Sequence, residues 1–324
     1  MIDLPRSSAG AVVWQVSGGP PVRGYSDVLL RYGVALIGPG DAGRWESGRS
    51  DDDFEGSFVR RFAEELKEGD VIVLRTGLSV INAIGLVSDV YQYANVFDDV
   101  NGWDLQHTRR VRWCVLPTPH TFGSFAFGAN PPRCARVWNK EVVDFAERFL
   151  RSPPTYWQTA ALPELPHEEP PLDQVPDALQ GIVAQAADLV PLLQDGHAFG
   201  EHPSEDELIA HFVVPFLRAL GWPPERIAVQ WRHIDVAVFR GLPRTPENCH
   251  LVIEAKRLGA GVEGALEQAK GYVAALGHSR DVIVTDGIRY RMYAGERGFA
   301  PLAYANLMRL KQPAADLFAR MKRQ

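Results

Sequence analysis

A run of prolines near the middle of the chain constrains the fold more than any other feature. Between Arg151 and Pro176 the sequence holds seven prolines. Proline fixes φ and lacks a backbone N–H, so this density excludes a helix or a central strand and is typical of a semi-rigid linker. The 324 residues leave room for a domain on each side. We expect an N-terminal domain over residues 1–150, a linker with a connecting helix over 151–200, and a C-terminal domain over 201–324.

The overall composition excludes several classes of protein. A hydrophobic content of 46% and 23% charged residues are ordinary for a globular protein. No window approaches the roughly 20 apolar residues of a membrane span, and no secretory signal is visible. The three cysteines lack the spacing of a disulfide framework or a zinc site. We therefore expect a cytoplasmic protein without a membrane partner.

The distribution of charge bears on the substrate. The net charge of −6 argues against indiscriminate binding to nucleic acid. Residues 201–324, however, hold more Lys and Arg than Asp and Glu, whereas residues 1–150 and 151–200 are both net acidic. A basic C-terminal part is compatible with a phosphate backbone as its substrate.

The order of predicted elements favours an α/β chain of the α+β kind. The N-terminal part alternates short, β-branched strands with helices, and two strands follow each other without a helix between them. This pattern indicates a mixed, partly closed barrel rather than a doubly wound sheet. The C-terminal part reads as helix, strand, strand, helix, strand, strand, which predicts a mixed sheet flanked by helices.

A catalytic pattern lies at the end of the apolar run 251–253. Glu254 and Lys256 are two residues apart on a predicted strand, so their side chains share a face. On the preceding strand, Asp235 interrupts the apolar alternation of Ile234 and Val236. Two carboxylates and one ammonium on neighbouring strands can hold a hard divalent cation and activate a water beside it. The sequence therefore predicts a metal-dependent hydrolase, with phosphodiesters as the favoured substrate.

Two helical residues extend this candidate site. Glu205 falls on the same helical side as Leu208 and directs a carboxylate toward the sheet. Gln268 and Tyr272 lie one turn apart and share a face. Each residue also has a structural interpretation: a strand-edge salt bridge for Glu254 and Lys256, a favourable helix dipole for Glu205, and a solvated surface for Gln268.

Several phrases together resemble the PD-(D/E)XK nuclease superfamily, and more narrowly the nuclease domain at the N-terminus of type I restriction enzyme R subunits. They are SEDELIAHFVVPFLRALGW at 204–222, Asp235, VIEAKRLG at 252–259, EQAKGY at 267–272 and TDGIRYRMY at 285–293. Ile234 stands where the family motif has a proline. The resemblance implies that Asp235, Glu254 and the Ala255 carbonyl bind Mg²⁺, which Mn²⁺ can replace. It also implies that Lys256 orients the attacking water or stabilises charge, and that Gln268 contacts the active site.

The N-terminal part resembles the PUA-like group that includes EVE and YTH domains. The matching phrases are EGDVIVLRTG at 68–77, INAIGLVSDVYQY at 81–93 and GWDLQHTRRVRWCVLP at 102–117. The resemblance implies an aromatic cage for a modified base that is flipped out of its strand. A flipped base needs flat apolar walls and a few polar groups at its edges.

Candidate residues for this base pocket fall into three groups. Trp14, Trp45 and Trp103 could form the walls, and Trp45 lies in a polar, glycine-rich segment where we do not expect a buried tryptophan. The groups that could read base edges are Ser79, Asn82, Asp104, Gln106 and His107. Arg109 and Arg110 could contact phosphates. The structural interpretation places Trp14 in the barrel core and the arginines on a solvated strand face.

These features combine into one functional hypothesis with two alternatives. We expect a modification-dependent restriction endonuclease whose N-terminal domain binds a modified base, such as a 5-substituted cytosine, in DNA and whose C-terminal domain cleaves with Mg²⁺. Cutting both strands requires two active sites, so we expect a homodimer or pairing on DNA. The first alternative is a nuclease that acts on RNA or on an unmodified DNA structure. The second is a nucleic-acid-binding regulatory module of a defence complex.

Overall fold

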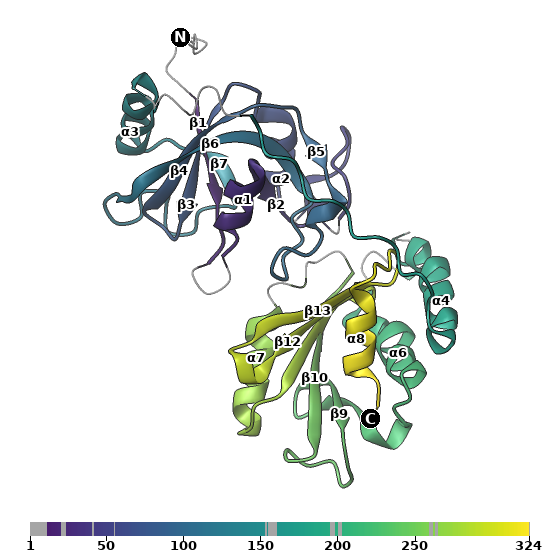
Figure 1. Ribbon diagram of the computed structural model, residues 1–324. Helices are drawn as coiled ribbons and strands as arrows, with labels where there is room; N and C mark the ends of the chain where they lie inside the picture. Colours follow the sequence, from purple (N-terminus) through teal and green to yellow (C-terminus); the bar gives the residue numbers. More distant parts are fainter. Residues whose placement is uncertain are drawn as a thin grey trace. The chain divides into compact units, whose positions relative to one another are not determined.

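The chain divides into two compact units, Met1–Glu168 and Glu169–Gln324 (Figure 1). The computed structural model describes residues 12–20, 24–40, 42–54, 56–152, 154, 161–194, 198–199, 203–258, 262 and 265–323. Within the expected linker over 151–200, positions 153, 155–160, 195–197 and 200 lie outside the described residues. Each unit is described by itself below.

The first unit is built from short strands with a few helical segments. Its strands are β1 (Val13–Ser17), β2 (Val34–Ile37), β3 (Val71–Thr76), β4 (Val80–Val87), β5 (Gln92–Tyr93), β6 (His107–Thr121) and β7 (Cys134–Arg136). Its helical segments are α1 (Ser26–Tyr32), η2 (Asp51–Phe54), α2 (Phe58–Arg60), the π-helical η3 (Arg61–Glu65), η4 (Asn95–Phe97) and α3 (Lys140–Arg151).

These strands form one sheet in the order β2-β6-β4-β3-β1-β7, with β5 beside β6. Strands β1 and β3 run parallel, and the other pairs are antiparallel. The long strand β6 pairs first with β2 and β5 and then with β4, so it carries the sheet around a bend. The result is a curled half-barrel, which confirms the expectation of a partly closed sheet.

The two faces of the curled sheet bury different clusters. The inner cluster includes the aromatic residues Trp14, Trp45, Phe54, Phe62 and Phe97. On the other face, α3 covers strands β4 and β6 through apolar residues at helical spacing: Val142, Ala146 and Leu150. Asn139 caps α3, because its side chain accepts a hydrogen bond from the Glu141 N–H at 2.9 Å.

A chain of hydrogen bonds crosses the inner core at His107. The Trp45 N–H donates to the Tyr91 hydroxyl at 3.0 Å, and this hydroxyl lies 2.7 Å from His107 Nδ1. His107 Nε2 lies 2.9 Å from the carbonyl of Pro39. Because a carbonyl can only accept, the ring proton belongs on Nε2 and Nδ1 accepts from Tyr91. Burial lowers the pKa of His107 to about 4, so the ring is neutral near pH 7.

Arg109 holds the end of the π-helical segment against the sheet. Its guanidinium is buried and donates to the carbonyls of Phe62, Ala63, Leu66 and Asp89. Helix C-termini leave carbonyls without intrahelical partners, and this side chain satisfies several at once. Burial lowers the pKa of Arg109.

The second unit places one six-stranded sheet between helices. Its strands are β8 (Ile227–Trp231), β9 (Ile234–Phe239), β10 (Cys249–Ala255), β11 (Asp281–Thr285), β12 (Arg289–Ala294) and β13 (Ala300–Asn306). Its helical segments are α4 (Asp177–Gln194), α5 (Glu205–Leu208), the π-helical η6 (Ile209–Val213), α6 (Val214–Ala219), η7 (Pro224–Arg226), α7 (Ala265–Leu276), η8 (Gly295–Arg297) and α8 (Ala314–Met321).

The strand order is β13-β12-β11-β10-β9-β8, and only β10 and β11 are parallel. Helix α7 connects these two strands and packs on one face through Ala265, Leu266, Ala269 and Val273. Helices α6 and α8 lie on the opposite face, and α4 packs against α6 (Figure 1). A mixed sheet flanked by helices was expected, and the structure confirms this fold class.

The long helix before the sheet lacks one backbone hydrogen bond, and a side chain from α4 replaces it. Ser204 and Glu207 form the expected capping box at its start. Pro215 has no N–H to donate to the carbonyl of His211 one turn earlier. Gln185 of α4 supplies the missing donor through its Nε2 at 2.9 Å. The π-helical turn η6 lies just before the proline, where the regular ladder is interrupted.

The expected linker splits between the two units instead of standing apart. Pro163 accepts a hydrogen bond from Arg110, and Leu165 packs against the inner core of the first unit. Leu172 donates its N–H to the Leu310 carbonyl at 3.0 Å in the second unit. Proline-rich chain without regular structure can therefore pack along a surface through carbonyls and apolar side chains.

Arg109→Met is expected to lower the free energy of unfolding of the first unit by about 3 kcal/mol, because buried carbonyls lose their charged donors. Urea unfolding followed by tryptophan fluorescence measures this change. Arg31→Met is the matched control, since this side chain is 65% exposed and removal should cost no more than about 0.5 kcal/mol. Equal effects of the two substitutions would contradict the assigned role of Arg109.

His107 should make the first unit sensitive to acid. Its pKa is about 4 in the fold and about 6.5 when unfolded, so the unfolded chain binds the proton more readily. The stabilising contribution is complete above pH 6.5 and is lost as the pH falls toward 4. The loss between pH 7.5 and pH 5 should be about 2 kcal/mol. Urea midpoints of the His107→Gln variant should lack this component, whereas His278→Gln, at an exposed position of the second unit, should retain it.

Candidate active site

The three residues of the predicted catalytic pattern meet at one end of two adjacent strands. Asp235 is the second residue of β9, and Glu254 is the second-last residue of β10. These strands are antiparallel with Ile253 opposite Val236, so the start of β9 lies beside the end of β10. Lys256 follows β10 directly, and its N–H donates to the Thr285 carbonyl at 2.8 Å. Strand pairing therefore brings together residues that lie far apart in the sequence.

Asp235 is positioned by two hydrogen bonds. Its Oδ2 accepts from the Ala255 N–H at 2.8 Å, and its Oδ1 accepts from Gln230 Nε2 at 3.3 Å. The N–H and C=O of one strand residue point to the same edge. The Ala255 carbonyl is therefore directed toward the Asp235 side of β10. This places a carboxylate and a backbone carbonyl, two oxygen donors, next to each other.

The Glu254 side chain is fully buried, but only one of its two carboxylate oxygens has a hydrogen-bond partner. Its Oε1 accepts from Lys256 Nζ at 2.6 Å, whereas its buried Oε2 has no hydrogen-bond partner. An unsatisfied buried acceptor costs roughly 1–3 kcal/mol, and more when it is charged. A cation at this oxygen would remove that cost.

The electrostatics of the pair follow from this burial. Burial, with a smaller contribution from the nearby Asp235, raises the pKa of Glu254 to about 7 against the opposing effect of Lys256. Burial alone would lower the pKa of Lys256, but Glu254, Glu205 and Asp235 together raise it. Lys256 therefore stays protonated at neutral pH, while Glu254 can exchange its proton there.

Glu205 comes close to the same ammonium group from the first turn of α5. Its Oε1 lies 3.9 Å from Lys256 Nζ, and its side chain is 40% exposed. The apolar stripe of this helix packs on the sheet, which directs the neighbouring carboxylate toward the end of β10. Glu205 thus lies at the edge of the cluster formed by Asp235, Glu254 and Lys256.

Gln268 is not hydrogen-bonded to the cluster. Its Nε2 donates to the Tyr272 hydroxyl at 2.8 Å on the exposed side of α7. Gln268 and Tyr272 share a helical face as expected, and their side chains therefore contact each other.

Gln230 is a positioning residue that sequence analysis missed. It has φ of 53°, and Arg232 and His233 in the following turn have φ of 53° and 69°. Positive φ is uncommon for residues other than glycine, and such strain concentrates at functional sites. The turn lacks the glycine and asparagine typical of this geometry, so the sequence contained no signal for it.

The donor set fits a magnesium ion with few protein ligands. Among the residues described, no group of three or more His, Cys, Asp or Glu could hold a metal ion. The available donors are Asp235, Glu254 with its unpartnered Oε2, and the Ala255 carbonyl. Mg²⁺ commonly binds through one or two carboxylates and retains several waters, so these oxygens suffice.

Two of the expected base-stacking tryptophans are buried in the first unit. Trp14 is fully buried, and its Nε1 donates to Asp70 at 3.1 Å. Trp45 is 6% exposed, its ring lies tilted at 5.2 Å from the ring of Phe54, and its Nε1 donates to Glu64 at 3.0 Å. The expectation that Trp45 is exposed is corrected, because a polar segment folded inward where Glu64 satisfies the indole N–H.

The region around Trp103 is only partly open. Trp103 is half-buried, with its ring 6.1 Å from Tyr25 and the Arg133 guanidinium 5.8 Å from it. The expected edge readers next to it, Asp104, Gln106 and His107, are all buried. The Oε1 of Gln106 has no hydrogen-bond partner. This segment enters β6 along the inner face, which turns its polar side chains away from solvent.

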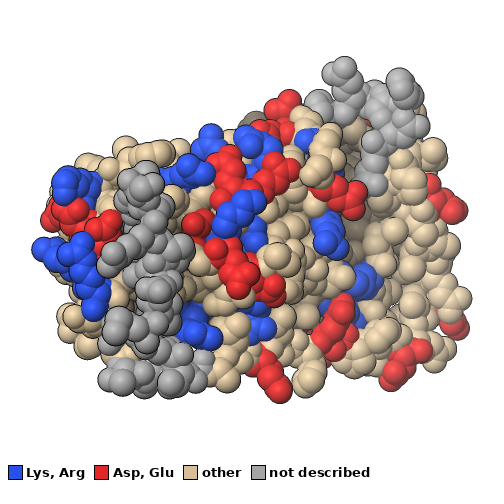
Figure 2. Space-filling view, turned by 90° about the horizontal axis from the view of Figure 1, so that it is seen from above, with Lys and Arg blue, Asp and Glu red and all other residues tan. Residues whose placement is uncertain are grey.

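The remaining candidates for the base pocket make hydrogen bonds within the first unit. Arg109 contacts backbone carbonyls and not an open surface, and Arg110 donates to the carbonyls of Gly33 and Pro163. Asn82 donates to the Thr76 hydroxyl at 2.5 Å, and the carbonyl of half-buried Ser79 accepts from the Phe122 N–H. The face in Figure 2 carries cationic and anionic side chains interspersed, without a broad patch of one sign.

Comparison with known proteins covers part of the first unit. A family model described as a domain of unknown function (DUF8426) matches residues 41–130. No curated protein and no solved structure matches the chain. Among the described residues, no helix is long and apolar enough to cross a membrane. The matched segment contains Trp45 and Trp103 and ends before the strands that carry Asp235 and Glu254.

Proposed function

We propose that the second unit is a magnesium-dependent nuclease that hydrolyses DNA phosphodiesters. The observation that carries this proposal is the buried carboxylate of Glu254, which has one oxygen on Lys256 and the other without a partner. An acid, a second acid on the next strand and a lysine at one sheet end suit a reaction at an anionic phosphorus centre.

Each residue has a chemical role in this proposal. Asp235, Glu254 and the Ala255 carbonyl would hold Mg²⁺, or Mn²⁺ in its place. When bound, the metal would polarise the phosphate oxygen and lower the pKa of an attacking water. Lys256 would hold the water in position and place its positive charge near the developing negative charge. Gln230 would keep Asp235 in its binding orientation, and Glu205 would limit the movement of Lys256.

We propose further that the first unit selects the substrate by binding a modified base, with 5-substituted cytosine in DNA as the favoured target. Support comes from the aromatic and histidine side chains gathered around β5 and the start of β6. Trp103, Tyr91 and Tyr93 are partly exposed, so they are now better candidates for stacking than Trp14 and Trp45.

The biological setting follows from this pair of activities. An enzyme that reads a modified base and cuts DNA suits defence against phage. Double-strand cleavage would need two copies of the chain, as a homodimer or paired on DNA. We place the enzyme in the cytoplasm, in keeping with three cysteines that are buried free thiols.

Asp235→Asn and Lys256→Met should each lower the Mg²⁺-dependent cleavage rate at least about 100-fold, because each removes charge that acts on the transition state. Cleavage is measured on plain, 5-methylated and 5-hydroxymethylated DNA duplexes and on RNA. Lys270→Met is the matched control, since this lysine pairs with Glu267 on the surface of α7.

Comparison of cleavage rates on these substrates distinguishes the proposed functions. Preference for a modified duplex supports the selecting role of the first unit, and equal cutting of plain DNA contradicts it. If the enzyme cuts RNA and no DNA duplex, its substrate is RNA. No cutting of any substrate by the wild-type chain would overturn the nuclease proposal.

Metal affinity should rise with pH up to neutrality. Glu254 has a pKa of about 7, so below that pH a proton competes with the metal. Affinity for Mg²⁺ should be about tenfold lower at pH 6 than at pH 8, with a proton released on binding. Calorimetric titration in buffers of different ionisation enthalpy measures both. Retention of the full pH dependence in Glu254→Gln would show that another group titrates.

A further inference from the structure

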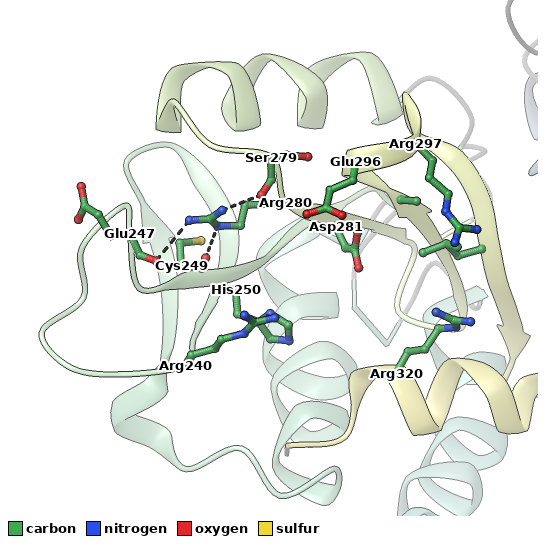
Figure 3. A pocket seen from close by; sticks show the side chains of 12 residues that line it. Arg240, Glu247, Cys249, His250, Ser279, Arg280, Asp281, Glu296, Arg297 and Arg320 are labelled. Carbon is green, nitrogen blue, oxygen red and sulfur yellow. Dashed lines mark hydrogen bonds between the residues drawn. The ribbon is translucent and has the colours of Figure 1, made fainter.

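A second, polar cavity lies at the opposite end of the same sheet. It has a volume of about 500 Å³ and is lined by residues that begin β10 and β11, including Cys249, His250 and Asp281 (Figure 3). The segment after β12 and the last helix α8 complete the wall with Arg297 and Arg320. The catalytic cluster lies where β10 ends, so the two sites are separated by the length of that strand.

We propose that this cavity binds a phosphomonoester group carried by a nucleotide. Its volume falls within the range of small-ligand sites, roughly 300–1,000 Å³. Guanidinium groups recognise phosphate oxygens through paired hydrogen bonds. The cavity is lined by four arginines and three acidic residues, so it can meet both the anionic phosphate and the hydrogen-bond donors of a sugar or base.

Two of the arginines are positioned for an anion between them. Figure 3 shows Arg297 and Arg320 pointing toward each other from separate elements. Arg320 pairs with Asp316 through its Nε at 2.9 Å, which leaves its terminal nitrogens for another partner. Arg297 makes no hydrogen bond or ion pair with any residue in the described part of the chain. Two cations facing each other repel, and a phosphate between them would reverse that cost.

His250 and Arg240 form a third contact point. Arg240 Nε donates to His250 Nδ1 at 3.0 Å, which leaves the ring proton on Nε2 as a donor. Burial and then the charge of Arg240 lower the pKa of His250 to about 4, so the ring is neutral near pH 7. The terminal nitrogens of Arg240 carry the positive charge at this end of the cavity.

Arg280 has a structural role in the same wall. It donates to the backbone carbonyls of Cys249, Pro246, Glu247 and Ser279, and Figure 3 shows this side chain turned to the backbone. These bonds hold the loop before β10 in place. The cavity therefore has one arginine that shapes its wall and three whose donors remain for a ligand.

The acidic residues favour a nucleotide over inorganic phosphate. Asp281 accepts from the Gly295 N–H at 3.1 Å and lies near Glu296 in Figure 3. Glu296 makes no ion pair with the arginines of the cavity among the described residues. Opposite charges that line one cavity without pairing are available to a ligand with both an anionic end and hydroxyl or amino donors. The source can be a free mononucleotide or the 5′-phosphate end of a DNA strand.

The test is equilibrium binding to the full chain without divalent metal, so that no cleavage takes place. Calorimetry with inorganic phosphate, AMP and GMP is compared with fluorescence anisotropy of 5′-phosphorylated and 5′-hydroxyl oligonucleotides. The variant combines Arg297→Ala with Arg320→Ala, and Arg323→Ala serves as the matched control because it is exposed and lies outside the lining. Circular dichroism of the ligand-free variants monitors folding.

We expect the double variant to bind the nucleotide probe at least about tenfold more weakly, with Arg323→Ala unchanged. Tighter binding of AMP or GMP than of the oligonucleotides identifies a free nucleotide as the ligand. Preference for the 5′-phosphorylated strand over its 5′-hydroxyl counterpart identifies a strand end. Equal binding by wild type and a folded double variant overturns the proposal, as does the absence of saturation by every probe at millimolar concentration. Because cleavage is not measured, failure of this site and failure of the nuclease proposal are separate results.

Discussion

The pairing of β9 with β10 is the constraint on which the candidate active site depends. It places Asp235 against the backbone of Ala255 and brings the buried Glu254 beside it. A buried carboxylate is costly unless something compensates its charge. Lys256 compensates one oxygen and leaves the other without a partner. The surrounding sheet, buried on both faces by helices, holds the acids in place despite that cost.

Elsewhere in the chain, side chains likewise supply hydrogen bonds to polar backbone groups that lack a partner. Arg109 gathers the carbonyls at the end of a π-helical turn, and Gln185 supplies the donor that Pro215 lacks. Arg280 holds a loop through backbone carbonyls at the far end of the sheet. In these cases the side chain satisfies polar backbone groups that would otherwise lack a partner. Glu254 and Arg297 differ because part of their bonding capacity remains unused, which is why both proposals rest on them.

Local patterns predicted the architecture well because they depend on neighbouring residues. The capping box at Ser204 formed, and the half-barrel and the flanked mixed sheet were both expected from the order of elements. Side-chain environments in the first unit were harder to predict. Trp45 lies in a polar segment, yet the segment turns inward because Glu64 and Tyr91 satisfy its polar groups. The roles of these residues in base recognition remain predictions.

The sequence by itself determined which residues share a strand face and where a helix begins, since alternation and capping act within a few residues. It thereby singled out Asp235, Glu254 and Lys256 as a group. Only the tertiary structure decided which distant groups meet: Gln230 on Asp235, Arg109 on the π-helical carbonyls, and Arg297 facing Arg320. Such contacts depend on strand register and on the packing of helices against the sheet, which no local pattern contains.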